Sequence, residues 1–309
     1  MKGRKKGGSP YSKRNFAELF QSQYEQISID DHLESLRAKW LQYNAKLFTS
    51  GNMLELEIYP INPVWKKNKG MKRAEASGPS RKAQRNLNDA NTRKHVSRLI
   101  HANFSSSDIW VTFNYGHERM PADLAEAAKH LRNYFKRLRR YIKKHCLPEL
   151  KYIYVTERVE NEKTGKVHTH HHIIMNFRNR DIAEGLWTLG GRSQARRLQP
   201  DSDGSLEGLA KYIAKPETKE GKRKGAKTYA HSQNLVKPEM RQSENRLPAT
   251  NYRISKKRIT EIALDENKAI ELLETHYKGY KLVSRIKAKF SKYTAGVYIY
   301  AQLMKIPAG

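Results

Sequence analysis

Four histidines fall within five positions of one apolar stretch, although the chain has only 12 in all. In Val167–Met175 they occupy positions 168, 170, 171 and 172. On a strand, side chains alternate between faces, so His168, His170 and His172 point the same way. Imidazoles at this spacing can share one divalent cation, and a carboxylate such as Glu157 would extend the choice to Mg²⁺ or Mn²⁺. A surface cluster with adventitious metal affinity is the alternative.

Tyr212 and Lys215 form a second candidate group. They lie three residues apart in a short segment, residues 205–215, that reads as a helix opened by Ser205. Taken alone, the pair is typical of an exposed helix surface. A tyrosine becomes a nucleophile when a metal or another cation stabilises its phenolate.

Three β-branched or aromatic stretches predict the strands that would position these residues. They are Ile109–Tyr115, Lys151–Glu157 and Val167–Phe177. A polar turn at residues 161–165 joins the last two into a hairpin. With a helix between the first two strands, this order predicts an α+β fold, an antiparallel sheet with helices packed on it.

The helix between those strands is predicted from Pro121 to the residues before Pro148, with Asp123 and Glu126 near its start. Its apolar positions follow alternating spacings of four and three: Leu124, Ala128, Leu131, Phe135, Leu138 and Ile142. The remaining surface is basic, and we expect Arg132, Lys136 and Arg139 to contact a nucleic-acid backbone.

Weaker patterns predict a strand at 53–59 that ends at Pro60, and a helix from Asn86 to Ala102 with Val96, Leu99 and Ile100 on one face. Near the C-terminus they predict a helix at 265–276 and a tyrosine-rich end. We expect a basic N-terminal extension (1–85), a central domain (86–250) and a C-terminal segment (251–309) that packs on it.

The composition points to a polyanionic partner. The 309 residues carry 60 Lys and Arg against 31 Asp and Glu, a formal charge of +29. Basic residues gather in 1–14, 66–94 and 219–227, and the last cluster adds Lys222 and Arg223 to the expected DNA contacts. No apolar run is long enough to span a membrane. A single cysteine, Cys146, permits no intramolecular disulfide, so we expect a reducing cytoplasm.

The pattern resembles the HUH endonucleases, and most closely the phage-type rolling-circle replication initiators. Trp110–Tyr115 is similar to their first motif. Lys151–Glu157 with the histidine strand is similar to the second, and Gly208–Lys215 to the third. The histidine run offers two registers, His168 with His170 or His170 with His172. The second is preferred because Ile173 and Ile174 follow directly.

The resemblance implies a palm-like fold in which Glu157, His170 and His172 hold a divalent metal. It implies that Tyr212 nicks single-stranded or unwound origin DNA, assisted by Lys215, to give a 5′-phosphotyrosyl link and a free 3′-OH. The implied partners are origin DNA and the replication machinery of a bacterial host cell. A non-catalytic basic nucleic-acid-binding protein and a related single-tyrosine transposase remain as alternatives.

Overall fold

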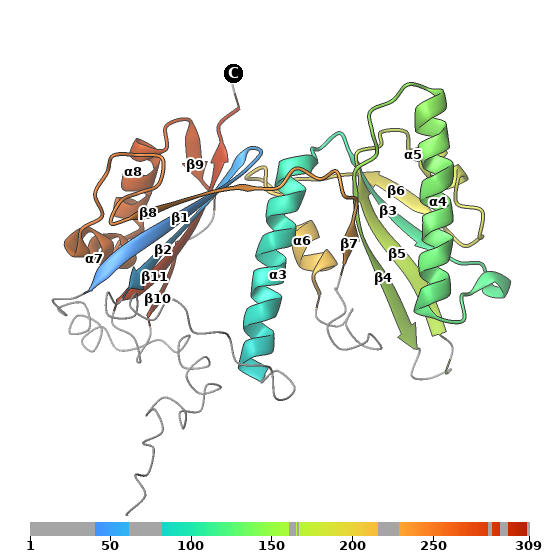
Figure 1. The fold of residues 1–309 in the computed structure, drawn as a ribbon, viewed down its shortest axis with the longest axis horizontal. Helices are drawn as coiled ribbons and strands as arrows, with labels where there is room; N and C mark the ends of the chain where they lie inside the picture. The colour runs from blue at the N-terminus through green and yellow to red at the C-terminus, as the bar shows by residue number, and fades with distance from the viewer. Residues whose placement is uncertain are drawn as a thin grey trace, which may run out of the picture. The chain divides into compact units, whose positions relative to one another are not determined.

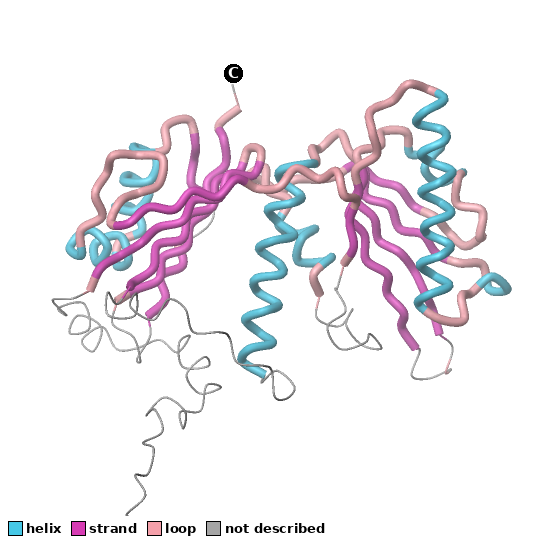
Figure 2. Tube along the Cα trace, viewed as in Figure 1, coloured by secondary structure: helices cyan, strands magenta, loops and turns pink. Residues whose placement is uncertain are grey.

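The computed structural model describes residues 41–61, 82–160, 165, 167–215, 229–283, 286–290 and 296–307. These residues form two compact units (Figure 1). The first unit contains the described residues up to Phe48, those within Leu54–Ala90 and those from Met240 onward; the second contains Thr49–Met53 and Asn91–Glu239. Each unit combines a sheet with helices, which confirms the predicted α+β class (Figure 2).

A five-stranded antiparallel sheet is the frame of the second unit. Its order is β6-β3-β5-β4-β7, so β6 is an edge strand and β5 is central. The strands are β3 (Ile109–Asn114), β4 (Tyr152–Glu160), β5 (Val167–Met175), β6 (Gln194–Arg197) and β7 (Ala230–His231). The neighbours β4 and β5 form the predicted hairpin, with Tyr152 opposite Met175 and Glu160 opposite Val167.

Helix α4 (Leu124–Lys144) covers one face of this sheet (Figure 1). The Asp123 side chain caps the helix by accepting a hydrogen bond from the Glu126 amide. Its apolar side packs on odd-numbered positions of β3 and β5, together with the short helix α5 (Arg180–Gly185). This core contains Val111, Phe113, Ile173, Met175, Leu131, Tyr134, Phe135 and Leu138.

The opposite face of the same sheet packs against α3 (Lys82–Asn103) and α6 (Glu207–Ile213). Ile153, Val155 and Ile174 come from the strands. The predicted helix face of Val96, Leu99 and Ile100 is buried against them, which confirms that prediction. The alternation of side chains along each strand therefore gives the sheet two separate cores.

The first unit is built on a six-stranded sheet of order β10-β11-β2-β1-β8, with β9 paired to β11. Helices α7 (Lys256–Leu264) and α8 (Glu266–His276) pack on one face, against a core that includes Leu56, Ile58 and Ile299. The strands are β1 (Gln42–Ser50), β2 (Met53–Ile61), β8 (Glu239–Glu244), β9 (Tyr280–Leu282), β10 (Lys287–Phe290) and β11 (Val297–Lys305).

Three details differ from the sequence predictions. The strand predicted to end at Pro60 continues to Ile61, because proline removes one amide donor but fits extended backbone. On α4, Ala127 and Tyr134 are buried, whereas Leu124 and Ala128 are only partly covered. The compact units also differ from three consecutive segments, because strands from both ends of the chain share one sheet.

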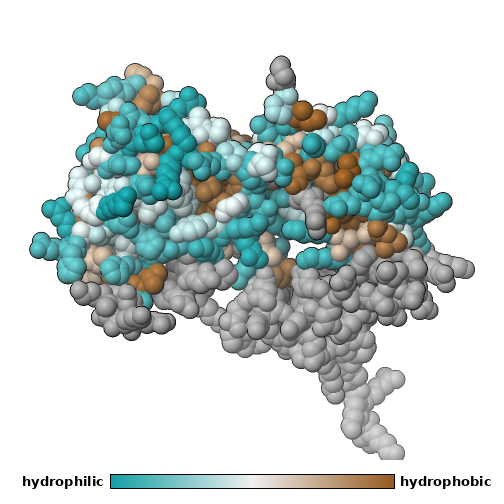
Figure 3. All heavy atoms as spheres, turned by 180° about the vertical axis from the view of Figure 1, so that it is seen from behind, coloured by the Kyte–Doolittle hydropathy of each residue, from teal (hydrophilic) through white to brown (hydrophobic). Residues whose placement is uncertain are grey.

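The predicted basic segments lie largely outside the described residues. This holds for residues 1–14, for the run from 66 to 81 and for the cluster at 219–227. The described surface visible in Figure 3 is mostly hydrophilic, with hydrophobic side chains in separate patches. None of the helices in the described ranges combines the length and apolar character that crossing a membrane requires.

The imidazole of His101 joins α3 to the start of α6. Its Nδ1 lies 2.8 Å from the Ser97 carbonyl oxygen, and its Nε2 lies 3.0 Å from the Leu206 amide, which donates to it. This pairing needs a neutral ring with a proton on Nδ1. Burial, the largest cause, lowers the pKa of His101 from its usual 6.5.

We predict that His101 makes the free energy of unfolding fall as the pH drops below about 6.5, because the unfolded chain then binds a proton that the folded chain excludes. The slope from this group is at most about 1.4 kcal/mol per pH unit. Urea unfolding at several pH values should show a flatter dependence for His101→Gln than for the wild type. His145→Gln, at an exposed position, serves as the control. Equal slopes for the wild type and His101→Gln would contradict the prediction.

Candidate metal and tyrosine site

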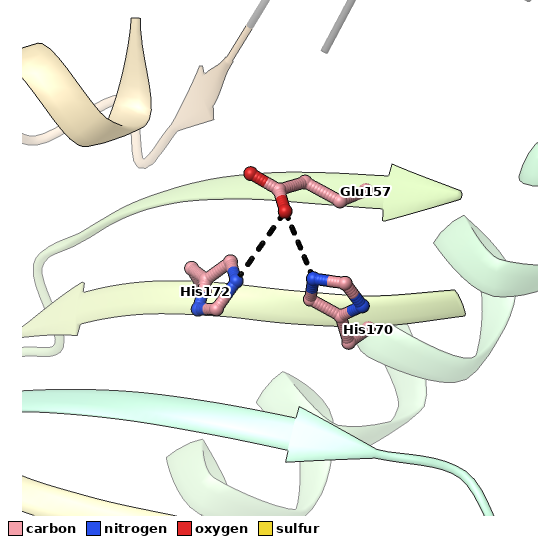
Figure 4. A group of neighbouring side chains, drawn as sticks. All are labelled: Glu157, His170 and His172. Carbon is pink, nitrogen blue, oxygen red and sulfur yellow. Dashed lines mark hydrogen bonds and ion pairs between the residues drawn. The ribbon is translucent and has the colours of Figure 1, made fainter. Parts of the chain in front are cut away.

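The pairing of β4 with β5 brings one carboxylate and two imidazoles together. Glu157 is the cross-strand partner of His170, and Val155 is the partner of His172. Because side chains alternate, Glu157, His170 and His172 all project on the face that packs against α3 and α6. Figure 4 shows the Glu157 carboxylate directed at both rings.

The carboxylate is the centre of this group. Its Oε2 lies 2.8 Å from His170 Nε2 and 3.7 Å from His172 Nε2. The hydrogen bond with His170 is the largest cause that holds the pKa of Glu157 well below its usual range, followed by the bond with His172. Glu157 is therefore ionised at neutral pH. Its second oxygen, Oε1, is buried without a hydrogen-bond partner among the described residues.

The second nitrogen of His172 is fixed by β3. Thr112 is the cross-strand partner of His172, and its Oγ1 lies 3.0 Å from Nδ1. Trp110 stacks on the His172 ring with the centroids 5.3 Å apart and the planes 20° apart. When Nδ1–H donates to Thr112, the lone pair of Nε2 is left for a cation or a proton donor.

The two remaining histidines of the run have different surroundings. His168 is exposed and lies opposite Val159, outside the Glu157 group. His171 points to the α4 face, where its nitrogens lie 2.8 Å from the Tyr115 hydroxyl and 2.8 Å from Thr156 Oγ1. Burial, the largest cause, lowers the pKa of His171 to about 3, so this ring is neutral. The structure thus groups His170 with His172 and leaves His168 apart.

Helix α6 delivers Tyr212 to the open side of the group. The Tyr212 hydroxyl lies 2.8 Å from His172 Nε2, and its ring meets Trp110 edge-on at 5.3 Å. Burial, and next the negative charge of Glu157, raise the pKa of Tyr212 to about 12. The phenol is therefore protonated at neutral pH and needs a nearby positive charge to become a good nucleophile.

Lys215 follows one helical turn later. Its Nζ lies 3.9 Å from the centroid of the Tyr212 ring. An ammonium group over the face of a tyrosine is attracted by the ring and is placed to stabilise negative charge on the phenolate. The structure thus brings Tyr212, Lys215 and the Glu157 group into one site.

The basic residues predicted to contact DNA are not part of this site. Arg132, Lys136 and Arg139 are exposed on α4, which covers the other face of the sheet. Arg139 also contacts Tyr152, with its guanidinium 5.8 Å from the ring centroid. Lys222 and Arg223 lie outside the described residues.

The donor set fits a divalent cation. One atom from each of Glu157, His170 and His172 can be chosen so that all three lie within 4.8 Å of one another. Ligand atoms at the usual ~2.0–2.2 Å from one ion lie at most about 4.4 Å apart, so small adjustments suffice. The unsatisfied Oε1 adds a further oxygen ligand. Two imidazoles favour ions such as Mn²⁺ or Zn²⁺ over Mg²⁺.

Sequence reasoning missed two residues of the site, Thr112 and Trp110, as individual contributors. Both lie on the predicted strand at 109–115, and the alternation of that strand places them on one face. Their contact with His172 depends on how β3 pairs with β5, which periodicity within one strand does not encode. The register Thr112 to His172 is a property of the assembled sheet.

Comparison with known proteins gives one match. Residues 108–220 match a family model of replication-associated proteins, the ORF2 type. This stretch is just over a third of the chain and contains every residue of the site, from Trp110 to Lys215. Neither the search of curated proteins nor the search of solved structures gives a significant match. The match supports a role in DNA replication for this part of the chain.

We predict that the Glu157 group binds Mn²⁺. Glu157→Gln and His172→Ala each remove a ligand and should weaken Mn²⁺ binding by more than about 100-fold, because even residues that only support ligands often contribute 10–100-fold. Titration calorimetry, or the electron paramagnetic resonance signal of free Mn²⁺, measures the change. His168→Ala is the matched control and should leave the affinity unchanged. Equal losses in all three variants would exclude this ligand set.

We also predict that Thr112 orients His172. Thr112→Val keeps the shape but removes the hydrogen bond to Nδ1, so Mn²⁺ affinity should fall by about 10–100-fold. Thr112→Ser keeps the hydroxyl and should retain most of the affinity. A Thr112→Val variant that binds Mn²⁺ as tightly as the wild type would show that the ring needs no such support.

Proposed function

We propose that the protein initiates rolling-circle DNA replication by nicking one strand of origin DNA with Tyr212. The observation that carries the proposal is the position of the Tyr212 hydroxyl, 2.8 Å from His172 Nε2 in the Glu157 group. The nucleophile and the ion ligands therefore meet at one point. The family match over residues 108–220 supports the replication context.

The chemistry follows from the groups that meet there. The Tyr212 oxygen attacks the scissile phosphorus and forms a P–O bond, while the bond from phosphorus to the 3′ oxygen breaks. The phenol proton leaves, and the 3′ oxygen gains one to become a free hydroxyl. Bound at Glu157, His170 and His172, a divalent cation, Mn²⁺ or Mg²⁺, supplies Lewis-acid polarisation of the phosphate.

Two features of the chain set the reactivity of Tyr212. Burial and Glu157 keep the phenol protonated, which protects the nucleophile until positive charge is present. Lys215, close to the ring, offsets negative charge that develops on the phenolate and the phosphate. The covalent link conserves the phosphodiester bond, so rejoining the strand needs no nucleotide cofactor.

The proposal also implies its partners. The substrate is single-stranded or unwound origin DNA, and the free 3′-OH primes synthesis by the replication machinery of the host cell. Arg132, Lys136 and Arg139 remain proposed contacts for DNA beyond the site, on the α4 face. Lys222 and Arg223 are proposed contacts from the basic segment.

We predict that Tyr212→Phe abolishes formation of a covalent protein–DNA adduct, because phenylalanine lacks the attacking oxygen. The full-length protein is incubated with Mn²⁺ and end-labelled single-stranded DNA that carries the origin, and adducts are detected on denaturing gels. Tyr229→Phe, a change at a half-buried tyrosine outside α6, is the control and should react like the wild type. An adduct of equal yield in Tyr212→Phe would overturn the proposed nucleophile.

A further inference from the structure

The edge strand β6 presents an arginine on the same face as the metal and tyrosine site. Gln194 is the cross-strand partner of Thr112, and Arg196 is the partner of Trp110. Thr112 and Trp110 in turn pair with His172 and Ile174 on β5. Partners in an antiparallel pair share a face, so Gln194 and Arg196 continue the row of site residues to the sheet edge.

The packing of the neighbouring residues confirms which way Arg196 points. Ala195 belongs to the core on the α4 side, whereas Leu198 belongs to the core on the α3 and α6 side. Arg196 shares the parity of Leu198, so its side chain projects on the site face. Arg197 has the other parity, and its guanidinium donates to the Ser107 carbonyl.

Arg196 is charged, exposed and without a bound counter-ion. Its guanidinium has no hydrogen bond or ion pair among the residues that the structure describes. A guanidinium offers five donors in a planar fork that matches a phosphate group. In contrast to Arg197, Arg196 has no partner among the described residues to account for its position.

The segment before β6 is built against β3 rather than draped over it. Gly191 has φ +76°, and a Cβ on it would lie 2.6 Å from the Asn114 carbonyl, closer than any side chain permits. The Asn114 side chain donates to the Arg192 carbonyl at 2.6 Å. Glu184 accepts from the Ala195 amide at 2.5 Å. These contacts fix β6 at the edge beside the site.

Trp110 connects Arg196 to the reacting groups. The indole stacks on His172, meets Tyr212 edge-on and is the cross-strand partner of Arg196. Strand spacing of ~4.8 Å and a rise of ~3.4 Å per residue place the Cα atoms of Arg196 and His172 on the order of 12 Å apart. This separation suits a phosphate next to the scissile one, rather than the scissile phosphate itself.

We propose that Arg196, with Gln194 beside it, forms a subsite for a backbone phosphate of single-stranded DNA, adjacent to the scissile phosphate. The identity of the ligand rests on the proposed function. The strand enters the site across the β6 edge, on the face opposite α4. A single strand held there lies along Trp110 towards Tyr212.

The test measures occupancy at the subsite itself. Full-length protein carrying Tyr212→Phe, in EDTA, is titrated with a short oligothymidylate that contains 4-thiothymidine, and irradiated. Mass spectrometry then gives the crosslink yield at residues 110 and 192–198, so DNA bound elsewhere on the basic chain does not contribute. The titration is repeated with Arg196→Gln and Arg197→Gln added, two changes that remove the same charge from adjacent positions on opposite faces.

We expect Arg196→Gln to weaken the apparent affinity at these peptides by about tenfold, because a charge-assisted hydrogen bond is lost. The dependence of log affinity on log salt concentration should become shallower by about 0.7, the change for one phosphate contact on a single strand. Arg197→Gln should change the affinity less than about twofold and leave the slope unchanged.

Two results would overturn the subsite. One is a parent protein that gives no crosslinks at residues 110 and 192–198 at saturating DNA. The other is an Arg196→Gln protein that is folded and matches Arg197→Gln in affinity and slope. Failure of the proposed function has a different signature, because an absent tyrosyl adduct in the wild type with an intact Arg196 effect removes the nicking reaction but leaves the subsite.

Discussion

The contact between the Glu157 carboxylate and the imidazoles of His170 and His172 is the constraint on which the site depends. It exists because β4 and β5 pair in one register, with Glu157 opposite His170. A slip of one residue would turn every side chain of β5 over and present His171 in their place. The buried apolar residues of β5 resist this slip, since Ile173 and Ile174 already fill separate cores on the two faces.

The same contact couples the metal ligands to the nucleophile. Glu157 is ionised because the histidines donate to it, and its charge together with burial raises the pKa of Tyr212 to about 12. Without a cation the carboxylate opposes formation of the phenolate; with one, the local charge changes sign. Ligand binding and activation of the tyrosine are therefore parts of one electrostatic arrangement, in which Thr112, Trp110 and Lys215 fix the geometry.

The two faces of the sheet divide the labour of holding DNA. The chain has a large positive charge, and the sequence suggests the basic surface of α4 as the place where a strand is held. The structure puts α4 on one face and the tyrosine on the other. A strand that reaches Tyr212 must therefore pass the face formed by β6, β3 and β5, where Arg196 lies. The charge of α4 acts on DNA at longer range or on a separate portion of it.

Local pattern was enough to predict the three strands, the hairpin, the amphipathic helix and the grouping of Glu157, His170 and His172 as candidate ligands, because alternation and helical spacing are properties of neighbouring residues. It did not predict β1, the separate helix α7 or the sharing of one sheet by both ends of the chain, which depend on contacts between distant segments. The roles of Thr112 and Arg196 were likewise out of reach. The sequence by itself determined which residue types are available for metal binding and nucleophilic attack. Only the tertiary structure decided which of them meet, because strand order and register are set by the packing of whole elements.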